Sequence, residues 1–454
     1  MPRLVICARL EKAAQKETVK NNNNHISALV LRHVTLDAAV TAALLHLIES
    51  KDDDNHCWES ISFDRCRDSG GVANNNNNNN LSRILSAMLT PTRGVSVKKL
   101  VLIQPLHSAL AMVGKKLHET THHLETLKIQ GEISTHDAEV LAEGVAANST
   151  LTCLDCSQCF FDKNDNDSFM ILMAGISRHQ RLRTLRLEAC FLEDEQLEQL
   201  FRHDRLPTSI QEIYLGVNFL QSRGTRALAT LLQNTHHSLQ KLDMSRQDVW
   251  DDRSYVHLLI DALEVNTTLI SLDISSNFLD DSHLRLLANA LVKNRTLQEL
   301  NMGGNSFHTS LEGILFFAER LPFMNGLRCL RMTNTRLTNN QLESLAQGLK
   351  GNVTLQTLVL DHHHHNTSEQ HHHHHHHHHH AQTLITLYLT LNRGGRILKR
   401  STNNYFPRGL WSLVLARTTR TTLVVSDEKA TDDPSISAAD VIYDLLHGPI
   451  LLER

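Results

Sequence analysis

The chain alternates between two hydrophobic periods. Residues 266–274 read NTTLISLDI, in which apolar and polar positions alternate as in a half-buried strand, and leucines with helical spacing follow over 284–291. The same cycle starts again at Asn294, 28 residues after Asn266 (294 − 266). A strand pattern followed by a helix pattern at a fixed interval predicts a solenoid in which every repeat is one strand and one helix.

The strand part of this cycle recurs along most of the chain as two inward apolar residues with one outward residue between them. Two degenerate examples lie near the N-terminus, at residues 29–31 and 61–63, and the later ones keep a mean spacing of 28.7 residues (387 − 100 = 287, over ten steps). The expected inward pairs are Leu100/Leu102, Leu127/Ile129, Leu154/Cys156, Leu185/Leu187, Ile213/Leu215, Leu242/Met244, Leu272/Ile274, Leu300/Met302, Leu330/Met332, Leu358/Leu360 and Leu387/Leu389.

The pattern LxxLxLxxN resembles the leucine-rich repeat, and the 28-residue interval resembles the ribonuclease-inhibitor-like class. The resemblance implies an α/β fold: a right-handed horseshoe solenoid with a parallel β-sheet on the concave face and helices on the convex face. Near the C-terminus, LYLTLNRGGRIL, GLWSLVLAR and VIYDLLHGPILLER look like the cap of repeat proteins from diatom-type algae. The resemblance to that family implies a repeat scaffold and no particular activity.

Three regions follow from these patterns. Residues 1–24 form a charged N-terminal lead, 25–391 the solenoid with its first two repeats degenerate, and 392–454 the C-terminal cap. The asparagine run at 74–80 predicts a loop insertion ahead of a helix over 81–89. The histidine-rich stretch 362–380 stands where other repeats carry their helix, and the strand pattern is expected to resume at Leu387.

Composition narrows the functional classes. The net charge is −4 over 454 residues with no basic stripe, which disfavours nucleic acid as a partner. Charged residues at 9–17 leave no room for a secretory apolar core, and no apolar run reaches the ~18 residues of a membrane helix. We therefore expect a soluble cytoplasmic protein that does not bind membranes.

The cysteines at 153, 156 and 159 have the C-x-x-C-x-x-C spacing of a metal site. The repeat register favours a structural role, because Cys156 takes an inward leucine position while Cys153 faces the other side of the strand. Cys159 takes the position of the repeat asparagine, as do Cys66 and Cys190. We expect buried thiols and no bound metal.

Four of the Asn-x-Ser/Thr sequons also have two interpretations. They match glycosylation acceptors, but each is followed by leucine and they recur at the repeat interval, so we expect helix-to-strand turns. These sequons begin at Asn148, Asn266, Asn294 and Asn352.

The histidine tracts at 362–365 and 371–380 can chelate divalent metal ions, but a flexible chelator of this kind is weakly selective. We expect adventitious metal binding at most. No phosphate loop, HExxH or GxSxG motif occurs, so the sequence predicts neither an enzyme nor a cofactor.

The outward residues of the strands remain as the candidate site. A mixed array of charges with a few aromatic residues on a wide surface suits a protein partner of unknown identity, although a merely solvated sheet face is the alternative. Tyr214, Arg186 and Arg331 are the expected anchors. A GTPase-activating protein of the same repeat class is the alternative function. The predicted partner-binding residues are Lys128, Asp155, Arg186, Glu188, Tyr214, Asp243, Asp273, Asn301, Arg331 and Tyr388.

Overall fold

The computed structural model describes residues 28–49, 57–68, 80–90, 96–118, 123–162, 168–202, 205–234, 237–247, 253–307, 311–360 and 372–393. The expected N-terminal lead, almost all of the expected cap, the asparagines at 74–79 and the histidines at 362–365 lie outside these residues. The chain divides into two compact units, Met1–Leu259 and Ile260–Arg454, and each is described by itself.

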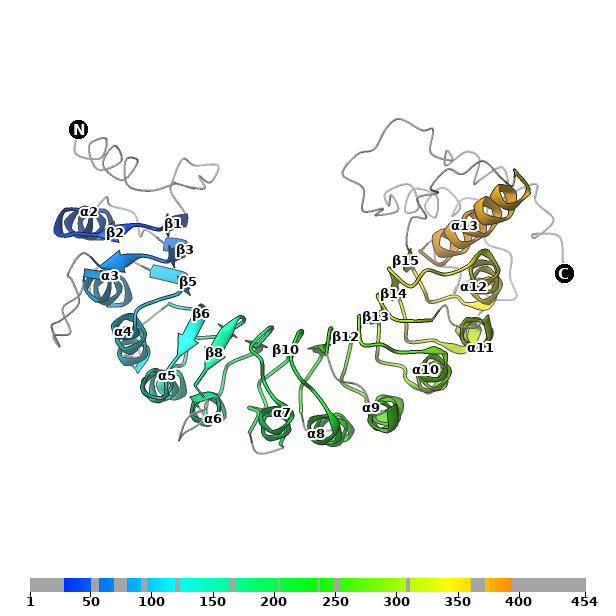
Figure 1. Cartoon of the computed structure of the whole chain (residues 1–454), viewed down its shortest axis with the longest axis horizontal. Helices are drawn as coiled ribbons and strands as arrows, with labels where there is room; N and C mark the ends of the chain where they lie inside the picture. The colour runs from blue at the N-terminus through cyan, green and yellow to red at the C-terminus, as the bar shows by residue number, and fades with distance from the viewer. Residues whose placement is uncertain are drawn as a thin grey trace, which may run out of the picture. The chain divides into compact units, whose positions relative to one another are not determined.

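The first unit carries one parallel sheet whose strands follow the chain order (Figure 1). Its strands are β1 (Ala28–Arg32), β3 (Cys57–Asp64), β5 (Ser96–Ile103), β6 (Thr126–Ile133), β7 (Cys153–Asp155), β9 (Thr184–Arg186), β10 (Glu212–Tyr214) and β11 (Lys241–Asp243). In addition, β8 (Cys159–Phe161) pairs with β6, and β2 (Thr35–Leu36) pairs with β4 (Arg67–Asp68).

A helix follows almost every strand of the first unit and covers the same side of the sheet (Figure 1). These helices are α2 (Ala38–Glu49), α3 (Asn80–Leu89), α4 (His107–His118), α5 (Thr135–Ala147), α6 (Ser168–Ile176), α7 (Asp194–Leu200) and α8 (Ser222–Gln233). The boundary between the units falls within α9 (Arg253–Val265).

The second unit repeats the arrangement with the strands β12 (Ser271–Asp273), β13 (Glu299–Asn301), β14 (Cys329–Met332) and β15 (Thr357–Leu360). Its helices are α10 (Asp281–Lys293), α11 (Leu311–Arg320) with the 3₁₀ turn η2 (Leu321–Phe323), α12 (Asn339–Gly351) and α13 (His372–Arg393). Each unit is thus built of strand–helix repeats and has the α/β leucine-rich repeat fold.

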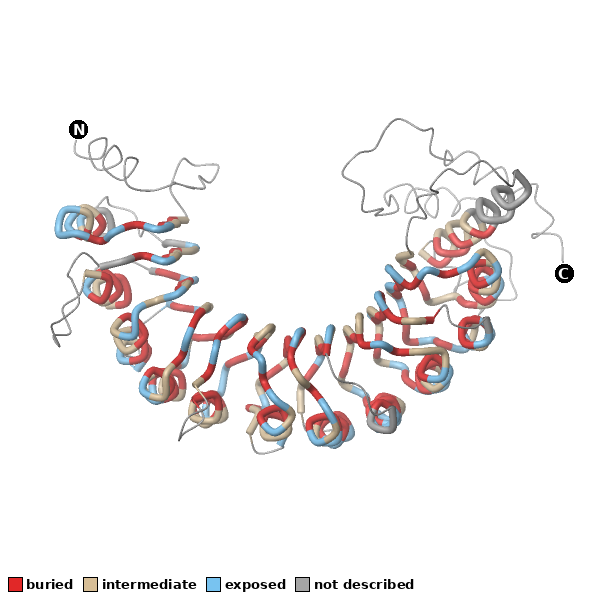
Figure 2. The backbone as a smooth tube through the Cα atoms, viewed as in Figure 1, coloured by how far each residue is buried: buried red, intermediate tan, exposed pale blue. Residues whose placement is uncertain are grey.

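The register places equivalent residues of successive repeats beside one another. Leu127 pairs with Leu154 in the first unit, and Leu272 with Leu300 in the second. These leucines are fully buried, because each lies between its own helix layer and the same leucine of the neighbouring strand. Figure 2 shows the helices buried along the side that faces the strands and exposed on the other. Burial of each leucine contributes roughly 1.5–3 kcal/mol, and this contribution depends on the adjacent repeat.

The repeat asparagines end the helices, as the sequence predicts, but for a different reason. Asn294 is the C-cap of α10 with φ −69°, so no left-handed backbone is involved. Its Oδ1 accepts from the backbone N–H of Thr296 and Leu297, and its Nδ2 donates to the carbonyl of Leu263 in the preceding repeat at 2.7 Å. Each such side chain therefore joins its own turn to the turn before it.

The prediction of a strand at Leu387/Leu389 is wrong. Residues 372–393 form one helix, α13, which begins in the histidine run and continues through the LYLTL segment. The buried residues of its second half follow helical spacing: Ala381, Ile385, Tyr388, Leu389 and Asn392. The alternating pattern of LYLTL fits a strand locally, but the longer apolar face of the helix decides the outcome.

The helix α13 is also tied to the last strand–helix repeat. Asn392 Nδ2 donates to the carbonyl of Leu355 at 2.8 Å, and Arg393 Nε donates to the carbonyl of Gln356 at 2.7 Å. Within the described part of the second unit, no strand follows β15. The repeat at the histidine run therefore contributes a helix and not a further strand.

Candidate functional site

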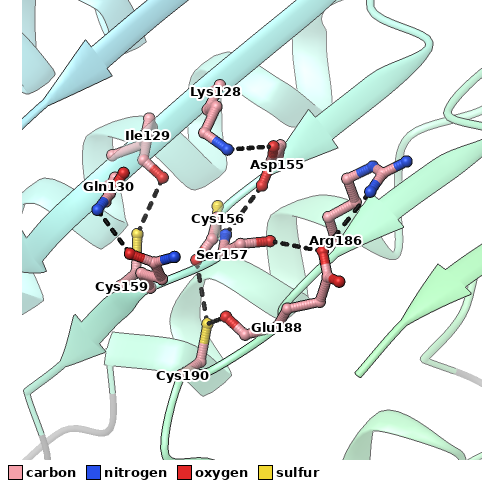
Figure 3. A network of polar contacts seen from close by, with 11 residues as sticks. Lys128, Ile129, Gln130, Asp155, Cys156, Ser157, Cys159, Arg186, Glu188 and Cys190 are labelled. Atoms are coloured by element: carbon pink, nitrogen blue, oxygen red, sulfur yellow. Dashed lines mark hydrogen bonds and ion pairs between the residues drawn. The ribbon is translucent and has the colours of Figure 1, made fainter. Parts of the chain in front are cut away.

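A continuous chain of polar contacts crosses the strand face of the first unit from β6 to β9 (Figure 3). Lys128 Nζ lies 2.9 Å from Asp155 Oδ2, and Asp155 Oδ1 accepts from the backbone N–H of Ser157 at 3.0 Å. Ser157 Oγ donates to Glu188 Oε2 at 3.3 Å, and Arg186 Nη1 lies 3.5 Å from the same oxygen. Charged side chains of three successive repeats are thus held in fixed positions on one surface, and we call these five residues the polar row.

The polar row continues onto β10 through Tyr214. The guanidinium of Arg186 lies 3.8 Å from the centre of the Tyr214 ring, and Lys241 Nζ lies 5.2 Å from it. The Tyr214 hydroxyl donates to Glu212 Oε2 at 3.1 Å. Only 8% of Tyr214 is exposed. The expected aromatic anchor is therefore engaged within the chain by Arg186.

The outward acidic residues share a second, local role. Asp155, Asp243 and Asp273 each end a strand, and each carboxylate accepts from the backbone N–H two residues later, at 3.0, 2.9 and 2.9 Å. This is the Asx turn that short polar side chains make where a strand bends into a loop. The repeated Asp-x-Ser sequence therefore stabilises the end of the strand, whether or not a partner binds.

The predicted residues of the second unit form a smaller cluster. Asn301 Nδ2 donates to Asp273 Oδ2 at 2.7 Å, and Asn301 Oδ1 accepts from the N–H of Gly303 at 3.2 Å. Arg331 lies on β14 and is exposed. Tyr388, expected on the same surface, lies on α13 and is buried, because it belongs to the helix that replaces the expected strand.

The structure thus brings together Lys128, Asp155, Arg186, Glu188 and Tyr214 in the first unit, and Asp273 and Asn301 in the second. Asp243 lies on β11 beside Tyr214, its register partner on β10.

The cysteines have structural positions, as predicted. Cys156, Cys159 and Cys190 are buried. The Sγ of Cys159 contacts the carbonyl of Ile129 at 3.2 Å, and that of Cys190 the carbonyl of Cys156 at 3.0 Å. A hydrogen bond with Cys159, together with burial, raises the pKa of Cys156 well above its usual range. Burial likewise raises the pKa of the Cys190 thiol, so Cys156 and Cys190 stay protonated and are poor nucleophiles.

Within the described ranges, no three His, Cys, Asp or Glu side chains are grouped so as to hold a metal ion. The helices that the structure describes include none with the length and apolar character needed to cross a membrane.

Sequence reasoning missed a row of three phenylalanines at the loop edge of the sheet in the first unit, of which Phe160 and Phe191 are exposed and Phe219 is half-buried. Phe160, Phe191 and Phe219 each follow the asparagine or cysteine of their repeat. The Phe160 and Phe191 rings stack at 5.4 Å, and the Phe191 and Phe219 rings lie 6.2 Å apart. The signal was present as the dipeptides Cys-Phe, Cys-Phe and Asn-Phe at the repeat interval.

No family model matches the chain. Among solved structures, the actin-binding site 2 of leiomodin-1 is similar over 32% of this chain and 77% of that chain, with 25% identity and a TM-score of 0.27. The leucine-rich repeat-containing protein LegL7 from Legionella pneumophila is similar over 64% of this chain and 88% of that chain, with 16% identity and a TM-score of 0.42.

Proposed function

We propose that this protein is a non-catalytic scaffold of the ribonuclease-inhibitor-like repeat class that binds a protein partner on the strand face of its first unit. The observation that carries the proposal is the polar row, in which charges of three successive repeats are fixed by one another. The interval of about 28 residues and the full helix in most repeats support the class.

Fixed charges favour binding because little side-chain freedom remains to be lost. Ordering a long side chain at an interface costs about 0.5–1.5 kcal/mol. Lys128, Arg186 and Glu188 already hold their positions through the contacts of the polar row. The guanidinium of Arg186 also lies against the Tyr214 ring. In this position it presents its planar fork of N–H donors to an incoming carboxylate or carbonyl.

The chemistry of the polar row also indicates what kind of partner fits. Cations and carboxylates alternate across the strands, so a surface with one sign of charge would meet repulsion at every second position. A folded protein with interspersed charges and amide groups matches such a surface better than a polyanion does. We therefore expect a protein surface as the ligand.

The test is affinity purification from the native cell with three baits: the wild type, a strand-face variant (Lys128→Ala with Arg186→Ala) and a helix-face variant. The helix-face variant changes Lys115 and Glu143, which are exposed on α4 and α5, to Ala. A partner enriched by the wild type and the helix-face variant but lost with the strand-face variant supports the proposal. A partner retained by the strand-face variant overturns it.

Lys128→Ala removes the cation that lies against the largely buried Asp155, so it could weaken binding by destabilising the fold. A further variant separates these two effects. Gln130 Nε2 donates to Gln158 Oε1 at 2.7 Å on the same face. Changing both to Arg adds two bulky charges to the surface without removing a charged pair. This double variant is expected to bind the partner more weakly while its far-UV circular dichroism matches the wild type.

GTPase activation remains the alternative activity for a protein of this repeat class. It predicts that the purified chain accelerates GTP hydrolysis by at least one small GTPase in a panel. Binding without acceleration favours the scaffold, and acceleration by the wild type would replace the scaffold proposal with the alternative.

A further inference from the structure

The row of phenylalanines at the loop edge is an apolar surface of the first unit, and among the rings that the structure describes in the second unit Phe278 and Phe323 are also exposed. Phe160 is 56% exposed and Phe191 49% exposed, and Val217 in the next repeat is 46% exposed. The two rings stack with an angle of 18° between their planes, and Phe219 extends the row. We call Phe160, Phe191, Val217 and Phe219 the aromatic edge. Contiguous exposed apolar surface of this kind marks an interaction site more often than single exposed residues do.

The aromatic edge is held in place by buried hydrogen bonds beneath it. Asn218 Oδ1 accepts from the N–H of Cys190 at 3.2 Å and of Leu192 at 3.0 Å, on either side of Phe191. Asn218 Nδ2 donates to the carbonyls of Leu187 and Leu215, both at 2.8 Å. Because the backbone around Phe191 is fixed from the inside, its ring is directed outward before any ligand arrives.

The backbone at this point is also strained. Phe191 has φ 54°, a left-handed conformation that a bulky side chain rarely adopts. Phe278 and Arg336 hold the same place in their repeats with φ 57° and 51°, so this conformation is a feature of the repeat.

The segments that form the aromatic edge carry acidic side chains and no basic ones, while Arg186 pairs with Glu188 at 3.5 Å and the exposed Arg246 holds the place of Val217 in the next repeat. The four described segments that form it are 130–134, 158–162, 187–194 and 215–221, and they contain no Lys, Arg or His. Glu132 is exposed and is the direct register partner of Phe160, and Glu193 is exposed two residues after Phe191. The carboxylates of these segments are Glu132, Asp162, Glu188, Glu193 and Asp194.

Apolar rings among carboxylates fit one kind of ligand. We infer that the aromatic edge docks a basic, apolar polypeptide segment of a partner protein, whose Lys or Arg side chains lie against the rings and near the carboxylates while its apolar side chains pack on the rings. Cations are attracted both by ring faces and by carboxylates, so the two features act on the same ligand. A nucleic acid strand could stack on the rings, but its phosphates would be repelled by the same carboxylates.

This inference does not rest on the proposed function, because Phe160, Phe191, Val217 and Phe219 are not members of the polar row, although Glu188 lies beside both surfaces. Lys128→Ala is therefore expected to leave binding at the aromatic edge unchanged. The two surfaces can be tested, and can fail, separately.

The experiment is a selection of random 16-residue peptides displayed on phage against the full chain, with removal of phage that also bind the variant Phe160→Ser, Phe191→Ser. The surviving peptides are then measured by fluorescence anisotropy against the wild type, this double variant and Phe323→Ser. Phe323 is a matched control, since it is 56% exposed but lies on η2 of the second unit.

The expected survivors carry net positive charge together with aromatic or branched apolar residues. They should bind the double variant about 100-fold more weakly, at about tenfold for each aromatic contact, and bind Phe323→Ser with unchanged affinity. Glu132→Lys should weaken them about fivefold, because it reverses a charge at the rim of the site.

Other results overturn the inference. The inference is wrong if the selection yields no peptide whose binding depends on the aromatic edge, or if the selected peptides are acidic. Survivors that match residues 396–420, a basic and apolar stretch of this chain, identify a segment of the protein itself as the occupant. A concentration-dependent dimer that the double variant abolishes in sedimentation velocity identifies a second copy. Oligothymidine binding that the double variant abolishes identifies a nucleic acid.

Discussion

Asn294→Ala tests how strongly one side chain joins successive repeats. Asn294 is 3% exposed, and its amide makes four hydrogen bonds with backbone groups. Its Nδ2 donates to the carbonyls of Leu263 at 2.7 Å and Asn266 at 3.1 Å, and its Oδ1 accepts from the N–H of Thr296 at 3.0 Å and of Leu297 at 2.8 Å.

Each of these bonds contributes about 0.5–1.5 kcal/mol, and a buried backbone group that loses its partner costs about 1–3 kcal/mol. The variant removes all four and cannot replace those to the buried turn. We therefore expect Asn294→Ala to lower the free energy of unfolding of the second unit by about 3–5 kcal/mol. Asn294→Asp keeps the acceptor but sets a carboxylate against two carbonyls, so it should still lose about 2 kcal/mol or more.

The control is Asn325→Ala. Asn325 is exposed and its side chain donates to the carbonyl of Phe323 at 3.1 Å, so the change should cost less than about 0.5 kcal/mol. Urea unfolding followed by far-UV circular dichroism measures the midpoint of each variant. Hydrogen exchange of peptides within residues 263–300 locates the loss, because repeat arrays can unfold in parts. Equal midpoints for the two alanine variants, with unchanged exchange over 263–300, would refute the reasoning.

Three further changes have definite expected outcomes. Gly144→Ala on α5 should lower the free energy of unfolding of the first unit by about 1–3 kcal/mol in urea titrations, because the new methyl group would collide with the carbonyl oxygen of Gly114 on α4. This loss is expected despite the higher helix propensity of alanine. An unchanged urea midpoint would contradict this packing. His179 takes the place of a repeat asparagine, and its Nδ1 accepts from the N–H of Leu182 at 2.9 Å, while burial, assisted by the charge of Arg181, lowers its pKa. As the pH falls, the unfolded state binds the proton first, so the contribution of His179 to stability is complete above about pH 6.5 and is lost below it. His179→Asn should therefore raise the urea midpoint more at pH 5 than at pH 8. An equal shift at both pH values would count against this role of His179. For Asp280, burial raises the pKa, but hydrogen bonds from Ser282 and His283 together with the charge of His283 outweigh this and lower it to about 2. Its contribution is therefore present above about pH 4 and is lost as the pH falls towards 2, and Asp280→Asn, which keeps an N-cap acceptor, should flatten the acid titration in that window.

The sequence predicted the repeat register because inward residues of successive strands must meet in the folded solenoid. Leu272, Leu300 and Leu358 are buried at matching places, as expected from their spacing. The segment at Leu387 was misread because LYLTL alternates over five residues, whereas the buried positions from Ala381 onward follow a helix. A window of a dozen residues is needed to separate the two periods.

The candidate site was predicted in part. The register already placed Arg186 beside Tyr214, so their contact followed from aligned repeats, although the sequence could not show that Lys241 Nζ also lies 5.2 Å from the centre of that ring. The aromatic edge was overlooked because the repeat pattern is defined by its inward positions and does not include the residue that follows each repeat asparagine or cysteine. Side-chain conformation, and not register, decides which outward residues a partner can reach.

The most direct test of the account is where the partner touches the chain. A photo-crosslinking amino acid is placed either at Gln130, on the strand face of β6, or at Glu143, exposed on α5 of the same repeat. The partner captured by the wild type is expected to crosslink from position 130 and not from position 143. Crosslinking from position 143 alone, or equally from both, would contradict the assignment of the strand face as the binding surface.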